Sequence, residues 1–308
     1  MVAPAASPHD VVPPPGALRA VALSAARAVA PALAAAFRAG PTRGAPASAE
    51  TKSNHHDLVT VHDRRTEERI VAALTAAVPG SRVLGEELGR HGGGADAEGG
   101  PPLEWIVDPI DGTSNFAHGF AMFSVSIAAA VHGEVVAGVV LDPVNGLAFS
   151  ADETGAYLGD APLADVGRPA PAGGERALNV VTSYPAGEAL DAEGEGALRR
   201  FGRLVATYAT VRRTVSGALE LCHVAAGWAD AALLVDTKPW DVAAGQLILR
   251  RAGGAYLTPA GPGGAGLTPD SPRAHEAAFA LALAPHRAAP TAEAVLGELL
   301  AVRADSRA

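Results

Sequence analysis

The strongest constraint on the fold is a run of strand patterns over residues 105–158, followed by alternating strand and helix patterns from residue 178 onward. Within the run, Phe123, Val125 and Ile127 alternate with serines, and Asn145-Gly146 is a strong hairpin signal. These patterns predict an antiparallel meander with helices packed on a face. We therefore expect an α/β (α+β) fold of two joined halves that share one cleft.

The predicted elements divide the chain into two parts. Residues 1–15 are Pro-rich and predict a disordered lead-in, residues 16–165 a first α+β half, and residues 166–308 a second α/β half. A Pro-, Gly- and Ala-rich stretch at 160–177 predicts the linker, and residues 92–102 predict an exposed insertion. The individual elements are expected as helices 17–37 and 63–78, strand 82–84, and then strand 178–182, helix 197–206, strand 210–214, helix 216–229, strand 231–235 and helix 239–252.

Composition excludes some classes of function. Hydrophobic residues make up 48% and charged residues 19% of the 308 residues, which is a globular composition. Aromatic residues are only 5%, so Ala, Val and Leu must fill the core, and this favours closely packed helix and sheet layers. The formal net charge of −9 argues against a nucleic-acid partner and suits a cytoplasmic enzyme.

A membrane partner is not expected either. Residues 17–37 are apolar, but Arg19 and Arg27 interrupt them and Pro31 would bend them, so they predict an amphipathic helix of a soluble protein. The start of the sequence lacks a basic region followed by an apolar run, so we expect no signal peptide. Cys222 is the single cysteine, and we expect it to be buried as a small hydrophobic residue.

The block that carries chemistry is Asp108-Pro109-Ile110-Asp111-Gly112-Thr113-Ser114-Asn115-Phe116, which follows the apolar strand Trp105-Ile106-Val107. Pro109 fixes the backbone between the two aspartates, and Gly112 allows a sharp turn. Two carboxylates three residues apart at a strand end repel each other, and a hard divalent cation would relieve that repulsion. Taken alone, the block is equally consistent with two ordinary turns.

Further carboxylates lie at other element ends. Glu86 and Glu87 follow the strand at 82–84, and Asp241 falls in the first turn of the helix opened by Pro239. Each has a structural explanation by itself: an acid in a first helical turn complements the helix dipole, and exposed glutamates are usually solvated.

The strings GEE (Gly85 to Glu87), DPIDGTSNF (Asp108 to Phe116) and WDVAAG (Trp240 to Gly245) resemble the three signature motifs of the inositol monophosphatase family, in order and spacing. The resemblance extends from about residue 52 to residue 254. It implies a layered α-β-α-β-α sandwich of the sugar-phosphatase type, and a Mg²⁺-dependent phosphatase in which two or three ions serve one site. A homodimer is a further expectation from the family.

The resemblance also implies a role for each matching residue. Glu86, Asp108, Asp111 and Asp241 would bind metal through carboxylates, and Ile110 through its carbonyl. Thr113 and Asp63 would orient the attacking water, with Glu86 counted among the catalytic residues. The N–H groups of Gly112 and Thr113 would hold phosphate oxygens. The remaining expected substrate contacts are Lys52, Ser216, Gly217 and Asp241, and Asp111→Asn is expected to abolish turnover and leave the protein folded.

The substrate follows less directly. Inositol monophosphate is the default, and the alternatives are fructose 1,6-bisphosphate, histidinol phosphate, phosphoadenosine phosphate, or a biosynthetic sugar or cyclitol phosphate. The acid that contacts inositol hydroxyls in the family is replaced within Leu233-Leu234-Val235, and Val215 stands where the family has glycine, which suggests a different loop shape. Lys238 would place a positive charge at the edge of the cleft. A non-catalytic regulatory binding protein is the alternative from another class.

Overall fold

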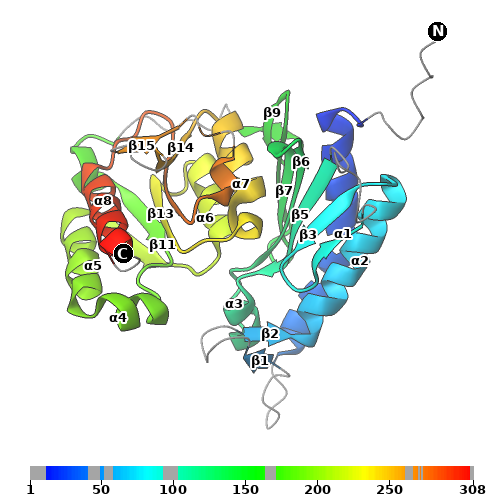
Figure 1. Cartoon of the computed structure of the whole chain (residues 1–308), viewed down its shortest axis with the longest axis horizontal. Coiled ribbons are helices and arrows are strands. Elements are labelled where there is room, and N and C mark those ends of the chain that lie inside the picture. Colours follow the sequence, from blue (N-terminus) through cyan, green and yellow to red (C-terminus); the bar gives the residue numbers. More distant parts are fainter. Residues whose placement is uncertain are drawn as a thin grey trace.

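The computed structural model describes residues 12–40, 49–51, 58–92, 103–163, 171–260, 266–269, 271 and 273–305, with the side chains of 49–51, 58–60 and 305 excepted. Two sheets and three layers of helices are stacked across the molecule (Figure 1). Lys52, the lead-in up to residue 11 and the predicted insertion after Gly92 lie outside the described residues.

The first sheet has eight strands in the order β10-β9-β8-β7-β6-β5-β3-β4. Neighbouring strands from β5 to β9 pair antiparallel, which confirms the predicted meander, and only β3 and β5 pair parallel. Gly146, with φ +70°, makes the predicted turn between β7 and β8. The strands are β3 (Arg82–Gly85), β4 (Gly89–His91), β5 (Leu103–Asp111), β6 (Ser124–Val131), β7 (Glu134–Asp142), β8 (Leu147–Asp152), β9 (Gly155–Leu158) and β10 (Ala161–Pro162).

Two helices, α1 (Pro15–Ala39) and α2 (Val61–Ala77), cover the outer face of this sheet. Proline at the first helical position suits the start of α1, and the N–H of Gly40 donates to the Phe37 carbonyl at its end. The helix thus begins inside the segment predicted as lead-in. α1 is the one described helix long and apolar enough to cross a membrane. One face of it is buried on β6, β7 and β8, as expected for the predicted amphipathic helix. The short strands β1 (Ala49–Thr51) and β2 (Leu58–Thr60) pair beside α2.

The second sheet has the order β12-β11-β13-β16-β14-β15. β11 pairs parallel with β12 and β13, and β16 pairs antiparallel with β13 and β14. β14 to β16 and the last helix α8 were not predicted. The strands are β11 (Asn179–Thr182), β12 (Thr210–Arg213), β13 (Ala231–Val235), β14 (Ala255–Pro259), β15 (Leu267–Thr268) and β16 (Phe279–Leu283), and the outer helices are α4 (Gly187–Glu193), α5 (Glu195–Thr207) and α8 (Pro290–Asp305).

The middle layer consists of α6 (Gly217–Ala225) and α7 (Pro239–Arg251), which lie between the two sheets. Small residues allow this close packing. A Cβ on Gly138 of β7 would lie 2.9 Å from the Cα of Ala244, and one on Gly245 would lie 2.8 Å from the Leu221 Cβ. The predicted five-layer α-β-α-β-α sandwich is therefore confirmed, with its layers held close by Ala and Gly. The described residues also form two short 3₁₀ helices, η2 (Gly174–Ala177) and η3 (Ala274–Glu276).

The division into two halves stays a prediction. The first sheet ends at Pro162 and the second begins at Asn179, so the predicted boundary at 165 falls between them, within residues 164–170 that are not described. However, α7 belongs to the second part of the sequence and packs on strands of both sheets. One buried cluster accordingly contains residues of both parts, among them Ile106 and Ala232.

Candidate active site

Asp108 and Asp111 stand where β5 leaves its register with β6, because the pairing shifts between these two residues. Both side chains are buried, at 2% and 5% exposed. The N–H of Ile110 donates to Asp108 Oδ1 over 3.0 Å, which fixes the first carboxylate against its own turn. Gly112 follows with φ +91°, and the short helix α3 (Thr113–His118) begins directly after it. The predicted sharp turn at Gly112 is therefore present. The strand, however, does not end at Val107 as predicted, because β5 continues to Asp111 and both aspartates lie in its irregular last part.

Asp63 and Thr113 meet although they are fifty positions apart. Asp63 is fully buried in the first turn of α2. Its Oδ1 lies 2.9 Å from the Thr113 hydroxyl oxygen, which is also 3.0 Å from the Ile110 carbonyl oxygen. A single hydroxyl proton serves one of these acceptors at a time. The geometry brings together the two residues that the sequence assigns to water orientation.

Asp111 reaches from the first sheet to the start of α6. Its Oδ2 accepts hydrogen bonds from the Ser216 hydroxyl and from the Ala218 N–H at 3.1 Å, and its Oδ1 accepts one from the Gly217 N–H at 3.0 Å. The predicted substrate contacts Ser216 and Gly217 thus donate to a predicted metal ligand. Their role toward substrate stays a prediction.

Glu86 and Asp241 approach the two aspartates from the turn after β3 and from the first turn of α7. Burial raises the pKa of Asp108 well above its usual range, and the charges of Glu86, Asp111 and Asp241 raise it further. Burial also raises the pKa of Asp241 to about 8, with smaller contributions from Asp111 and Glu86. The predicted ligands therefore form one electrostatically coupled group.

The donor chemistry fits a hard divalent cation. Buried carboxylates that repel one another are the oxygen ligands that Mg²⁺ prefers, and a cation would compensate their charge. Across the described residues, however, no three Asp, Glu, His or Cys side chains are arranged as a metal site. In this arrangement the two oxygens of Asp111 accept hydrogen bonds from the start of α6.

Asn115 joins the site to the second sheet, a role that the motif alone did not reveal. Its side-chain amide donates to the carbonyls of Met122 and Thr214, both over 2.7 Å. The neighbouring Val215 has φ +54°, the left-handed conformation that glycine favours. The valine therefore adopts a backbone conformation that glycine favours, and the predicted difference in loop shape stays a prediction.

Other sequence expectations have mixed outcomes. Leu233 and Leu234 are buried in the apolar interior, as their type dictates. Asp236 forms an ion pair with Arg303 of α8, with 2.7 Å between the Asp236 carboxylate oxygen and the Arg303 guanidinium nitrogen. Its side chain is therefore directed toward an outer helix of the second sheet. Lys238 is exposed at the start of α7. Cys222 is buried, as predicted.

Glu220 of α6 is a buried acid that sequence reasoning missed. Its Oε1 accepts hydrogen bonds from the Thr214 hydroxyl at 2.7 Å and the Ser183 hydroxyl at 3.0 Å, whereas no hydrogen-bond donor to its Oε2 is found in the described part of the chain. Burial raises its pKa from 4.5 to about 8. A glutamate between two leucines, within the predicted helix 216–229 that also holds Cys222, was the available signal.

Glu220→Gln is expected to flatten the dependence of stability on pH. The folded-state pKa of about 8 exceeds the unfolded value near 4.5, so the stabilisation by the protonated form is full below the lower value and is lost as pH rises through the upper one. Glutamine cannot ionise, so the variant should gain stability relative to wild type as pH increases across this range. Urea unfolding of both proteins at a series of pH values gives the free energy of unfolding as a function of pH. Parallel curves for wild type and Glu220→Gln would contradict the prediction.

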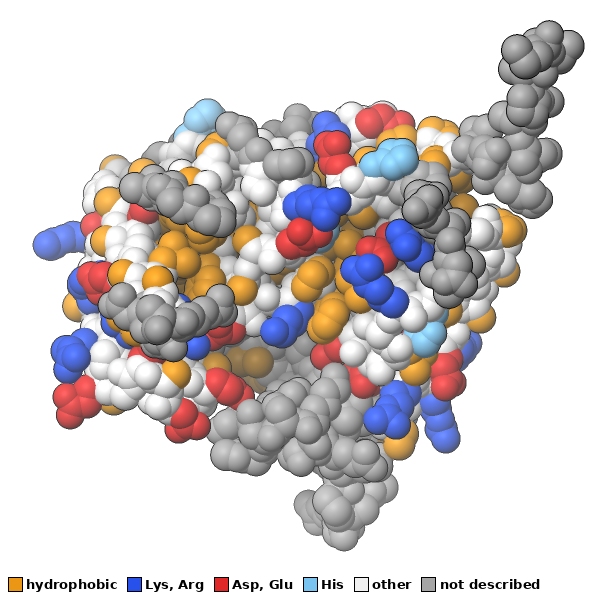
Figure 2. All heavy atoms as spheres, viewed as in Figure 1, with side chains coloured by type: hydrophobic (Ala, Val, Ile, Leu, Met, Phe, Trp, Pro, Cys, Tyr) orange, Lys and Arg blue, Asp and Glu red, His pale blue; other side chains and the backbone are white. Residues whose placement is uncertain are grey.

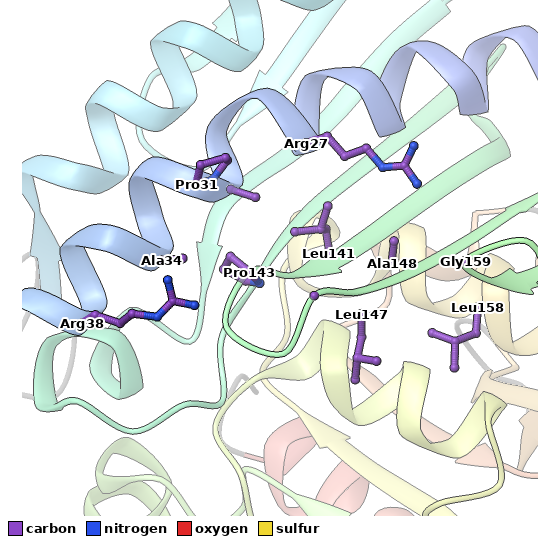
Figure 3. Close-up of a pocket in the computed structure, with 12 residues that line it drawn as sticks. Arg27, Pro31, Ala34, Arg38, Leu141, Pro143, Leu147, Ala148, Leu158 and Gly159 are labelled. Atoms are coloured by element: carbon purple, nitrogen blue, oxygen red, sulfur yellow. The ribbon is translucent and has the colours of Figure 1, made fainter.

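A separate cavity of about 570 Å³ lies between α1 and the β7–β8 hairpin, and none of these carboxylates lines it (Figure 3). Arg27 and Arg38 of α1 border it over an apolar floor that includes Leu141 and Leu147. On the face in Figure 2, Lys and Arg side chains are interspersed with Asp and Glu side chains. The absence of a nucleic-acid partner stays a prediction.

Comparisons with known proteins agree with this architecture. Residues 16–296 match the family model of the inositol monophosphatase family. The Nus factor SuhB of Pseudomonas aeruginosa is 39% identical over 199 residues, 64% of this chain and 71% of that protein. The inositol-1-monophosphatase of Bacillus subtilis is 36% identical over 215 residues, 68% of this chain and 75% of that protein.

A solved structure shows the same fold. The extragenic suppressor protein SuhB of Bartonella henselae superimposes with a TM-score of 0.74 at 28% identity, covering 91% of this chain and 98% of that one. The family match spans both sheets and all of the carboxylates described above. The chain therefore belongs to the inositol monophosphatase family.

Proposed function

We propose that this protein is a Mg²⁺-dependent phosphatase that hydrolyses a small phosphate monoester, with inositol monophosphate as the first candidate. The observation that carries the proposal is the Asp63–Thr113 hydrogen bond beside the buried pair Asp108 and Asp111. A hydroxyl held by a buried carboxylate next to clustered acids suits a reaction that needs an oriented water and charge neutralisation. The relatives named inositol-1-monophosphatase support the same reaction.

The proposed metal ligands are the carboxylates of Glu86, Asp108, Asp111 and Asp241 and the carbonyl of Ile110. Two or three bound Mg²⁺ ions would screen the phosphate, lower the pKa of a bound water and stabilise the leaving alkoxide. Because Asp111 already binds the start of α6, the same side chain would link the metal site to the second sheet.

The protein's own groups then position the reactants. The Thr113 hydroxyl donates a hydrogen bond to Asp63, so the Thr113 oxygen is left to accept a hydrogen bond from the attacking water. The N–H of Phe116 makes the first bond of α3, to the Gly112 carbonyl at 3.1 Å, so the N–H groups of Gly112 and Thr113 precede the helix's own bonding. We assign these two groups to the phosphate oxygens.

The alcohol part of the substrate would be recognised by residues of the second half of the chain. An inositol-binding acid has no counterpart within Leu233-Leu234-Val235, where both leucines are buried, and Arg303 binds Asp236. The exposed Lys238 instead favours substrates with a second anionic group. The alternatives therefore remain fructose 1,6-bisphosphate, histidinol phosphate, phosphoadenosine phosphate and a biosynthetic sugar or cyclitol phosphate. A homodimer and a cytoplasmic location complete the proposal.

Phosphate release from a panel of monoesters tests both parts. With inositol 1-phosphate and the named alternatives as substrates, we expect release only in the presence of Mg²⁺, with one ester clearly preferred. Preference for inositol 1-phosphate would support the default, and preference for a bisphosphate would support the role of Lys238. A folded, Mg²⁺-bound protein that releases phosphate from none of them would contradict this substrate assignment.

A regulatory binding role is the second candidate, because several relatives carry the name Nus factor SuhB. Retention of Asp63, Thr113 and the four proposed carboxylate ligands favours catalysis, since a purely binding protein has no need of a coupled acidic site. Phosphatase activity of the purified chain distinguishes the two.

A further inference from the structure

The turn after β3 carries Glu86, and a buried side chain of α2 holds that turn. Glu67 is fully buried. Its Oε2 accepts the N–H of Glu87 at 2.8 Å, and its Oε1 accepts the N–H of Leu88 at 3.0 Å. Each carboxylate oxygen therefore fixes one of the two backbone groups that follow Glu86. A carboxylate that accepts backbone N–H bonds is a strong, directional anchor.

Gly85 leaves the space that Glu67 occupies. A Cβ at Gly85 would lie 1.9 Å from Glu67 Oε1 and 2.5 Å from its Cδ, which no side-chain contact permits. The glycine is needed here for steric reasons, because it lies within β3 in a backbone conformation open to other residues. Gly85 and Glu67 are thus a complementary pair on either side of the turn.

The opposite side of Glu86 is held by β5. The Glu86 N–H donates to the carbonyl of Val107 at 3.2 Å, one residue before Asp108. The carboxyl groups of Glu86 and Asp108 are hydrogen-bonded to each other. Glu86 is therefore fixed between β5, which presents Asp108, and Glu67, which anchors the following residues.

One face of α2 serves both parts of the site. Asp63 and Glu67 are four residues apart, so their side chains lie on the same side of the helix. Asp63 binds the Thr113 hydroxyl, and Glu67 binds the turn that carries Glu86. We propose that Glu67 is a positioning residue that directs the Glu86 carboxylate to the cation, and that Gly85 is required to leave room for the Glu67 side chain. This inference rests on the proposed function.

Glu67→Gln keeps the shape of the side chain but turns an amide NH₂ toward one of the two N–H groups. We expect the dissociation constant for Mn²⁺, measured by calorimetry or by the EPR signal of free Mn²⁺, to rise about 10- to 100-fold, as for other groups that support metal ligands. The Mg²⁺ concentration needed for half-maximal phosphate release should rise by a similar factor, while kcat at saturating Mg²⁺ falls less.

Gly85→Ala should give the same weakening by displacing Glu67. Both substitutions disturb the same anchor, the contact of the Glu67 side chain with the turn after β3. The double variant should therefore bind Mn²⁺ about as well as either single variant. This variant also keeps the test open if Glu67→Gln fails to fold. Additive losses would mean that the two residues act separately and would overturn the pairing.

Glu175→Gln is the matched control. Glu175 lies in η2 and accepts the N–H and hydroxyl of Thr291 at 3.0 Å each, so its loss should lower stability without changing Mn²⁺ binding. If Glu67→Gln lowers stability in the same way and binds Mn²⁺ like wild type, Glu67 is only structural and the proposal fails. Asp108→Asn tests the proposed function itself. If wild type binds no Mn²⁺, or if Asp108→Asn binds Mn²⁺ as wild type does, the proposed function fails as well.

Discussion

Asp108→Asn is expected to lower phosphate release at saturating Mg²⁺ by about a thousandfold or more. Loss of one ligand charge removes several kcal/mol of transition-state stabilisation, and about 4 kcal/mol corresponds to that factor. The fold should survive, because asparagine keeps the Oδ1 that accepts the Ile110 N–H. Without a bound cation the variant should be at least as stable as wild type. Three other acids raise the pKa of Asp108, and a neutral asparagine is not repelled by their charges.

Phosphate release and thermal unfolding without Mg²⁺ measure the two effects together. Asp142→Asn is a suitable control: Asp142 is also buried, but it accepts hydrogen bonds from Val144 and Asn145 in the β7–β8 turn, so only stability should change. Wild-type turnover in Asp108→Asn would refute the metal assignment. Asp111→Asn is less suitable than the sequence suggested, because Asp111 also holds the start of α6.

Gly112→Ala is expected to destabilise the protein by about 3 kcal/mol and to abolish activity. A left-handed backbone costs a residue with a Cβ about 1–2 kcal/mol, and overpacking adds about 1–3 kcal/mol. Both apply, because φ is +91° and the Cβ would lie 2.9 Å from the Met122 carbonyl oxygen and 3.1 Å from that of Val215. These contacts would separate α3 from the loop of the second half.

Gly119→Ala separates the two contributions. Gly119 closes the same helix with φ +76°, but a Cβ there meets nothing within 4 Å, so only the backbone cost of about 1–2 kcal/mol is expected. Free energies of unfolding in urea, with activity of the folded fraction, give the comparison. Equal losses in the two variants would show that the close contact at Gly112 has no effect.

Local patterns predicted the meander because its information is local. Alternation in β6 and the Asn145-Gly146 turn each specify structure within a few residues. β16, in contrast, is the apolar pentapeptide from Phe279 to Leu283, which has no polar alternation because helix layers bury it. Such a run does not distinguish strand from helix, and the sequence around it gave no further signal.

The site was predicted through its motifs, and the supporting residues were not. Asp108 and Asp111 are only three residues apart in the sequence, so local structure is enough to bring them close together. Glu67 and Glu220 gain their roles only through contacts with distant backbone and hydroxyl groups. A buried acid on a helix can be suspected from its neighbours, but its partner depends on tertiary packing.

The bonds between Asp111 and α6 also affect the order in which the protein matures. The donors Ser216 and Ala218 follow Asp111 by 105 and 107 residues. During synthesis, the first sheet can therefore form while this carboxylate still lacks its partners and remains charged among other acids. The site is complete only when α6 and then α7, which carries Asp241, have emerged, so a nascent chain that stops before residue 216 carries two of the three signature motifs and no finished active site. Catalytic competence thus reports that both sheets have assembled.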